Sequence, residues 1–182
     1  TGYVAVTPSG LDYEKLEPAD VTLTDMDMQV IEGRHRPSVA LNLWINLMRA
    51  RPDELFAVVH THSPHATAFS VVHRPIPVIT ETMADWFGQA VPVTRYLSVE
   101  DPEFATLPVQ AMGDGYAVLL GNHGPITVGR TLEHALERAV TLEEAAHTCA
   151  IAQGLGTPVP VSDEQARASF DYYHHRYGQR QP

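Results

Sequence analysis

Two of the ten histidines stand one residue apart at the end of an apolar run that has the character of a buried strand. The run covers Phe56 to Val59 and continues directly into His60, Thr61 and His62. Alternate side chains of a strand lie on the same face, so His60 and His62 can reach one point while Thr61 lies on the other face. Histidine is the commonest metal ligand and the usual acid or base near neutral pH. The pair therefore indicates either a two-ligand arm or two polar rings at the edge of a sheet.

A third histidine has a similar setting. Residues 117–120 predict another apolar strand, which leads through Gly121 and Asn122 to His123. Zinc and related ions need three or four convergent ligands at about 2 Å, and three imidazoles that leave a position open are typical of a catalytic site. This third ring favours a divalent metal ion held by His60, His62 and His123. Three imidazoles can hold Fe²⁺ as well as Zn²⁺, and the residues themselves do not choose between them.

The elements that must position these rings follow from hydrophobic periodicity and turn residues. The chain has 182 residues, 44% of them hydrophobic, which is enough for one compact domain over residues 1–182. The predicted strands lie near 3–6, 21–24, 29–32, 56–59, 77–79 and 117–120, with the first three forming a β meander. The predicted helices cover 37–51, a segment from residue 64 onward, 102–112, 131–153 and 162–173.

Charge and hydropathy exclude several classes of function. The 22 acidic and 12 basic side chains leave a formal charge of −10, which would repel a nucleic-acid backbone. No apolar run approaches the roughly 18 residues of a membrane span, and the first residues lack the pattern of a signal peptide. We therefore expect a cytoplasmic protein that binds neither nucleic acid nor membrane. The chain lacks an initiator Met, so we also expect that an N-terminal segment is missing.

Several motifs, in order, resemble the class II aldolase/adducin family. They are Val6-Thr7-Pro8-Ser9-Gly10 with Tyr13-Glu14-Lys15-Leu16, Glu32-Gly33, Pro37-Ser38, Arg51-Pro52-Asp53, Val58-Val59-His60-Thr61-His62-Ser63 and Leu119-Leu120-Gly121-Asn122-His123-Gly124. The resemblance spans nearly the whole chain. It implies an α/β fold, a three-layer α/β/α sandwich around a central, largely antiparallel sheet. It also implies a homo-oligomer, often a cyclic tetramer, with active sites between the subunits.

The resemblance assigns roles to particular residues. His60, His62 and His123 match the ligands of a divalent ion, usually zinc, which polarises the carbonyl group of a small-molecule substrate. Ser9, Gly10 and Ser38 match residues that hold a substrate phosphate, and Tyr177 matches a terminal tyrosine that reaches a neighbouring subunit's site.

The departures from the family pattern concern the proton-transfer group. After Pro37-Ser38 the family has a second serine and then Glu or Asp, whereas this chain has Val39 and Ala40. Trp44 stands where the family often has His. Glu81 follows the Ile-Pro pair, near the place of a catalytic tyrosine, so it is either a replacement for the missing carboxylate or a solvated surface residue.

Three functions remain open at this stage. The first is a metal-dependent lyase that acts on a small carbonyl compound, with Ala40 in place of the usual Glu. The second is a non-haem iron oxygenase or decarboxylase of an aromatic 2-oxo acid, of the prenylated hydroxyphenylpyruvate type used in aminocoumarin antibiotic biosynthesis. The third is a non-catalytic, adducin-like assembly module. Convergence of three imidazoles argues against that third function, because a scaffold has no need of them.

Overall fold

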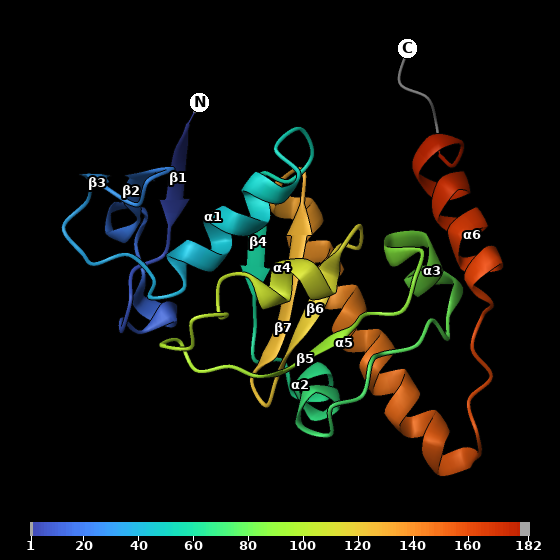
Figure 1. Ribbon diagram of the computed structural model, residues 1–182. Coiled ribbons are helices and arrows are strands. Elements are labelled where there is room, and N and C mark those ends of the chain that lie inside the picture. The colour runs from blue at the N-terminus through green and yellow to red at the C-terminus, as the bar shows by residue number, and fades with distance from the viewer. Residues whose placement is uncertain (1, 179–182) are drawn as a thin grey trace.

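The N-terminal part of the chain forms a small sheet of its own. The computed structural model describes residues 2–178. Strands β1 (Tyr3–Val6), β2 (Thr22–Asp25) and β3 (Val30–Glu32) pair antiparallel in that order, which confirms the predicted meander. Two short 3-10 turns connect β1 to β2. This sheet lies beside helix α1 (Leu41–Ala50), at the left of Figure 1.

The central sheet has four strands in the order β4-β7-β6-β5. Strands β4 (Ala57–His60) and β7 (Gly124–Gly129) pair antiparallel, and so do β7 and β6 (Ala117–Gly121). Only the pair of β6 with β5 (Val93–Tyr96) is parallel. The prediction of a largely antiparallel central sheet is therefore confirmed.

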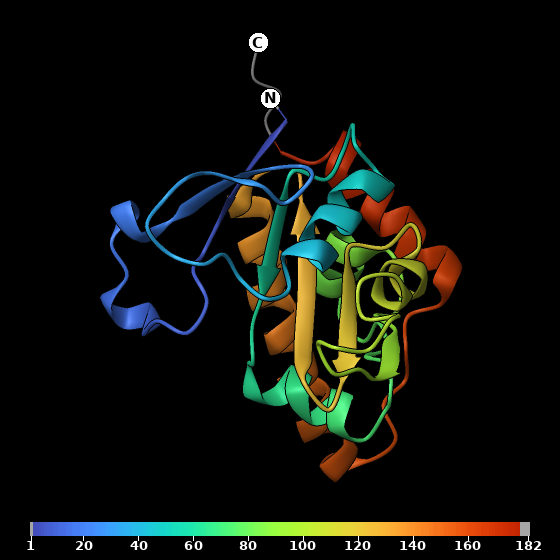
Figure 2. The ribbon, with the colours of Figure 1, turned by 60° about the vertical axis from the view of Figure 1, so that its left-hand side comes forward.

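Helices cover both faces of this sheet and complete the three layers (Figures 1 and 2). One face packs against α1 and α4 (Leu107–Met112), and the other against α2 (Pro64–Val71) and the long helix α5 (Leu132–Leu155). Helix α3 (Glu81–Phe87) packs on α5 and on α6 (Asp163–His175).

Strand β6 shows why the sheet is central. Its apolar residues alternate between two hydrophobic clusters, with Leu119 on the side of α2 and α5 and Leu120 on the side of α1 and α4. A strand that is buried on both faces reads as a continuous apolar run, and residues 117–120 have this pattern. No helix in the described part of the chain is long and apolar enough to span a membrane.

Some predicted elements were wrong. Residues 77–79 form no strand; only Ile76 pairs there, in an isolated bridge with Val91. Pro75 and Pro77 flank this bridge and lack the N–H groups that would extend a ladder. Helix α1 begins at Leu41 rather than at Pro37, and α4 begins only at Leu107. The sequence did not predict β5 and β7, because their short apolar segments are interrupted by Pro, Gly or charged residues.

Candidate metal centre

The fold brings the three histidines of the sequence prediction together at one end of the central sheet. One ring nitrogen from each of His60, His62 and His123 lies within 4.8 Å of the other two. The Nε2 atom of His60 lies 3.2 Å from Nε2 of His62 and 3.2 Å from Nε2 of His123. His60 ends β4, and His123 lies in the tight turn between β6 and β7.

Two local features place the turn that carries His123. Asn122 has a positive φ of 57°, its N–H donates to the Ser70 carbonyl, and its Oδ1 lies 2.7 Å from His73 Nε2. Gly124 approaches the chain next to His62 so closely that a Cβ there would be 2.4 Å from the Thr61 carbonyl oxygen. The short reversal between the strands therefore needs glycine at this position.

The protonation state of His60 suits a metal ligand. Its Nδ1 lies 2.9 Å from the carbonyl oxygen of Pro125, so the Nδ1–H donates to that carbonyl. This hydrogen bond leaves the lone pair of Nε2 directed at the other two rings. Burial lowers the pKa of His60 to about 4, and burial also lowers the pKa of His123. Both rings are therefore neutral near pH 7, as metal ligation requires.

The donor set fits a small divalent ion. Two imidazole nitrogens at 2.0–2.1 Å from a tetrahedral zinc ion are separated by about 3.3 Å, close to the 3.2 Å between His60 Nε2 and each of its neighbours. Neutral rings that direct lone pairs at one another at this distance repel unless a proton or a cation lies between them. A divalent cation bound by all three nitrogens would remove this repulsion.

The wall beside His60 is apolar. The ring centroid of Trp44, in the first turn of α1, lies 5.7 Å from that of His60. Ala40 is the residue that precedes α1, and it is 8% exposed. The cluster contains no carboxylate among the described residues. The start of α1 thus brings an indole ring next to His60, while Ala40 is buried in the core and carries no carboxylate.

Residues 1–150 match the family model described as Class II Aldolase and Adducin N-terminal domain. The chain belongs to this family. It is 34% identical over 174 residues to the L-ribulose-5-phosphate 4-epimerase UlaF of Salmonella paratyphi B, an alignment that covers 89% of this chain and 76% of the epimerase. The resemblance inferred from the motifs is therefore confirmed.

Solved structures agree with this class II aldolase assignment. An L-fuculose 1-phosphate aldolase superposes with a TM-score of 0.89 at 27% identity, over 95% of this chain and 81% of the aldolase. An L-fuculose-1-phosphate aldolase from Thermus thermophilus superposes with a TM-score of 0.70 at 26% identity, over 87% of each chain. The fold of this family member is thus that of the sugar-phosphate aldolases.

The loops that carry the predicted phosphate-binding residues lie side by side. The Ser9 N–H donates to the Arg36 carbonyl over 3.0 Å, and the Ser38 N–H donates to the Thr7 carbonyl over 3.1 Å. Gly10, with a φ of 75°, closes the turn after Ser9 and is exposed. The two segments, distant in sequence, therefore form one surface next to the start of α1.

The two predicted catalytic residues lie outside the histidine cluster. Glu81 is exposed in the first turn of α3, and its carboxylate has no hydrogen bond or ion pair with the described residues. Tyr177 follows α6, is 66% exposed and stacks on Tyr173 with a centroid distance of 5.3 Å. Neither side chain belongs to the histidine cluster, so both catalytic roles stay predictions, and that of Tyr177 involves a neighbouring subunit.

The sequence did not predict the role of Glu143, whose carboxylate supports the helix that follows His62. Glu143 of α5 accepts the backbone N–H groups of His65 and Ala66 in the first turn of α2, and His65 Nδ1 lies 2.7 Å from its Oε1. Burial opposes ionisation of Glu143, but these hydrogen bonds outweigh it and lower the pKa of the carboxylate. The anion caps the helix that follows His62. No sequence signal connects residues 78 positions apart.

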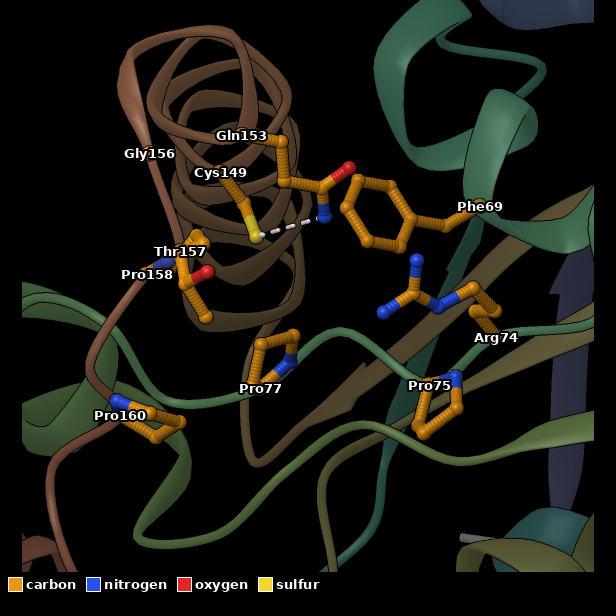
Figure 3. A pocket seen from close by; sticks show the side chains of 10 residues that line it. All are labelled: Phe69, Arg74, Pro75, Pro77, Cys149, Gln153, Gly156, Thr157, Pro158 and Pro160. Carbon is orange, nitrogen blue, oxygen red and sulfur yellow. Dashed lines mark hydrogen bonds between the residues drawn. The ribbon is translucent and has the colours of Figure 1, made fainter.

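One cavity lies away from the histidines, between the C-terminal ends of α2 and α5. It has a volume of about 510 Å³, and proline rings form much of its wall. Figure 3 shows Arg74 and Gln153 directed into it, with Gln153 Nε2 3.7 Å from the sulfur of Cys149. None of the three clustered histidines lines this cavity, so we do not assign it to the metal centre.

Proposed function

We propose that this class II aldolase family member is a metal-dependent, lyase-type enzyme that acts on a small carbonyl compound, with His60, His62 and His123 as the ligands. The observation that carries the proposal is the convergence of three Nε2 atoms, with His60 fixed as the Nδ1–H tautomer. A bound divalent ion would supply a Lewis acid for a carbonyl oxygen. Zn²⁺ is the first expectation, because neutral imidazoles at this spacing suit its tetrahedral geometry.

Ser9, Gly10 and Ser38 are proposed to hold the oxygen-rich end of the substrate. Their segments are joined by backbone hydrogen bonds and lie next to α1, whose Trp44 contacts the metal-ligand His60. The named relatives act on ketose phosphates, L-ribulose 5-phosphate and L-fuculose 1-phosphate. Val39 is 67% exposed and has no hydroxyl group to donate to a phosphate oxygen. A phosphate bound here would therefore have fewer hydrogen-bond donors than in the family pattern, which has a second serine at this position.

Proton transfer must come from a residue other than Ala40, whose methyl group cannot carry a proton. We propose Glu81 as acid and base, because its carboxylate is exposed and free of partners among the described residues. Tyr177 is proposed as a second group that a neighbouring subunit supplies, since its phenol is exposed beyond α6. The role of Tyr177 requires a homo-oligomer, which we expect to be a cyclic tetramer.

A second candidate is an iron-dependent oxygenase or decarboxylase of an aromatic 2-oxo acid, which would use O₂ as its oxidant. It is favoured by the indole ring of Trp44, 5.7 Å from the ring of His60, and by the apolar pair Val39 and Ala40 at the start of α1. An aromatic substrate without a phosphate group would pack on this wall.

One experiment separates the two functions. The protein is purified without added metal, its metal content is measured by elemental analysis, and portions loaded with Zn²⁺ or Fe²⁺ are tested on ketose phosphates and on 4-hydroxyphenylpyruvate. Cleavage or epimerisation of a ketose phosphate by the zinc protein supports the lyase-type function. Oxygen uptake by the iron protein with the 2-oxo acid supports the second candidate. Absence of bound metal after loading contradicts both.

A further inference from the structure

A second cavity, of about 300 Å³, lies at the opposite end of the central sheet from the histidine cluster. The histidine cluster lies at the end of β4 and in the β6–β7 turn. This cavity lies at the other ends of these strands, because Glu54 precedes β4, Tyr116 precedes β6 and Arg130 follows β7. Its lining residues are Glu54, Tyr116, Arg130, His134, Arg138, Phe170, His174 and His175. All but Glu54 are basic or aromatic, although the whole chain carries a formal charge of −10.

The central group of this cavity is a buried guanidinium. Arg138, on α5, is 4% exposed. Its Nη1 donates to the Val128 carbonyl over 2.7 Å, and its Nε donates to the Trp86 carbonyl over 3.4 Å. The guanidinium carbon lies 3.7 Å from the ring centroid of Tyr116. Carbonyl groups and an aromatic face solvate the cation, but no carboxylate among the described residues forms an ion pair with it.

The single carboxylate of the cavity is already engaged. Glu54 accepts two hydrogen bonds of 3.0 Å from Arg51, one on each oxygen, and Tyr116 Oη donates to the same carboxylate. Arg51 also lies over the Tyr116 ring, at 4.6 Å from its centroid. Glu54 therefore forms its ion pair with Arg51 and acts on Arg138 only at longer range, so Arg138 has no ion-pair partner among the described side chains.

A buried charge without an ion-pair partner destabilises the folded protein unless another group compensates it. Burial lowers the pKa of Arg138 to about 10, so the side chain stays cationic at neutral pH. Arg130 and the imidazoles of His134, His174 and His175 surround the same space and add donors at its rim. An oxyanion is the ligand that such a set of donors would recognise, because guanidinium groups form short, charge-assisted hydrogen bonds with phosphate oxygens.

We propose that this cavity binds a small phosphorylated molecule, with its phosphoryl group between Arg138 and Arg130 and its organic part against Phe170. The volume exceeds that of a phosphate group alone, and the aromatic rings of Tyr116 and Phe170, which stack at 5.5 Å, provide an apolar surface for the remainder. The site is distinct from the metal centre, because the two share no residue.

Occupancy would connect two helices. Arg138 lies on α5, while Phe170, His174 and His175 lie on α6, so a ligand in the cavity contacts both helices. Since a ligand that binds only the folded state stabilises it by mass action, the protein should melt at a higher temperature when the cavity is filled.

The test is thermal unfolding of the full chain in increasing inorganic phosphate and, separately, glycerol 3-phosphate, with chloride adjusted to keep the ionic strength constant. We expect a saturable rise in melting temperature of about 5–10 °C at a hundredfold excess over Kd. Arg138→Met keeps the packing of the stem and should abolish the rise. Arg130→Gln, at an exposed position, should weaken phosphate binding about tenfold.

Two controls separate this site from the metal centre and from general anion effects. Arg74→Gln removes an exposed arginine of the other cavity and should retain the phosphate response. Ser38 belongs to the proposed substrate site, which would itself bind phosphate, so Ser38→Ala measures the share of the response that comes from that site, and the share that depends on Arg138 should remain. The proposal is overturned if the wild type shows no response beyond chloride, or if both Arg138→Met and Arg130→Gln keep the full response. Should Arg138→Met not fold, Arg130→Gln alone decides between these outcomes. Because none of these readouts uses activity, failure here leaves the proposed lyase function untouched.

Discussion

Gly124→Ala is the substitution whose effect the structure specifies most directly. A Cβ at this position would lie 2.4 Å from the Thr61 carbonyl oxygen and 3.3 Å from Cδ2 of the His62 ring. Carbon and oxygen atoms in favourable contact stay about 3.3 Å or more apart. The segment that carries His62 and the turn that carries His123 must therefore separate by about 1 Å.

Both stability and metal binding respond to such a shift. Insertion of a methyl group into a closely packed site costs about 1–3 kcal/mol, which lowers the melting temperature of a protein of this size by about 3–10 °C. Metal–nitrogen distances tolerate only about 0.2 Å of displacement. We therefore expect metal affinity to fall about a hundredfold or more.

The assay compares the metal affinity of wild type and Gly124→Ala by competition with a chromophoric zinc chelator, with thermal unfolding of the metal-free forms in parallel. Gly154→Ala is the matched control, because no atom lies within 4 Å of a Cβ there and alanine favours the helix by about 0.5–1 kcal/mol. The reasoning is refuted if Gly124→Ala binds zinc as tightly as the wild type and melts within about 1 °C of it.

Four further outcomes are expected. His123→Ala should lose its divalent ion, measured by elemental analysis; a stoichiometric ion with full activity would contradict the ligand assignment. The free energy of unfolding of the metal-free protein should fall by about 2 kcal/mol as the pH falls from 6.5 to 4. The unfolded chain protonates His60 in that range, while burial keeps the folded ring neutral down to its pKa of about 4. Urea titrations at several pH values measure this loss, and His60→Gln should make the free energy of unfolding less dependent on pH. The wild type should cleave ketose phosphates very slowly. The double variant Val39→Ser with Ala40→Glu should raise turnover at least about tenfold, since a positioned acid or base contributes about 10²–10⁴ in rate. Ordinary turnover by the wild type would show that the missing carboxylate at Ala40 does not limit the reaction. Sedimentation should show a homo-oligomer, with turnover reduced in Tyr177→Ala; a monomer at micromolar concentration would argue against a shared site.

Local sequence patterns were sufficient for the parts of the fold that depend on neighbours along the chain. The strand before the first histidine pair forms as predicted but ends at His60, so His62 lies beyond the alternating segment. The apolar run before His123 follows from burial of β6 on both faces. Thr131 caps the N-terminus of α5 as predicted, with its side chain accepting the N–H of His134. These features need only the periodicity of one element, so the sequence by itself determined them.

Contacts between distant segments were decided by tertiary structure alone. The carbonyl of Pro125 sets the tautomer of His60, and Glu143 caps the helix that follows His62, yet neither partner is close in sequence. The pattern that predicts a helix over residues 131–153 does not single out Arg138, whereas packing buries it between Tyr116 and two backbone carbonyls. Burial and hydrogen-bond partners change the protonation and charge balance of a side chain, and only the folded chain determines both.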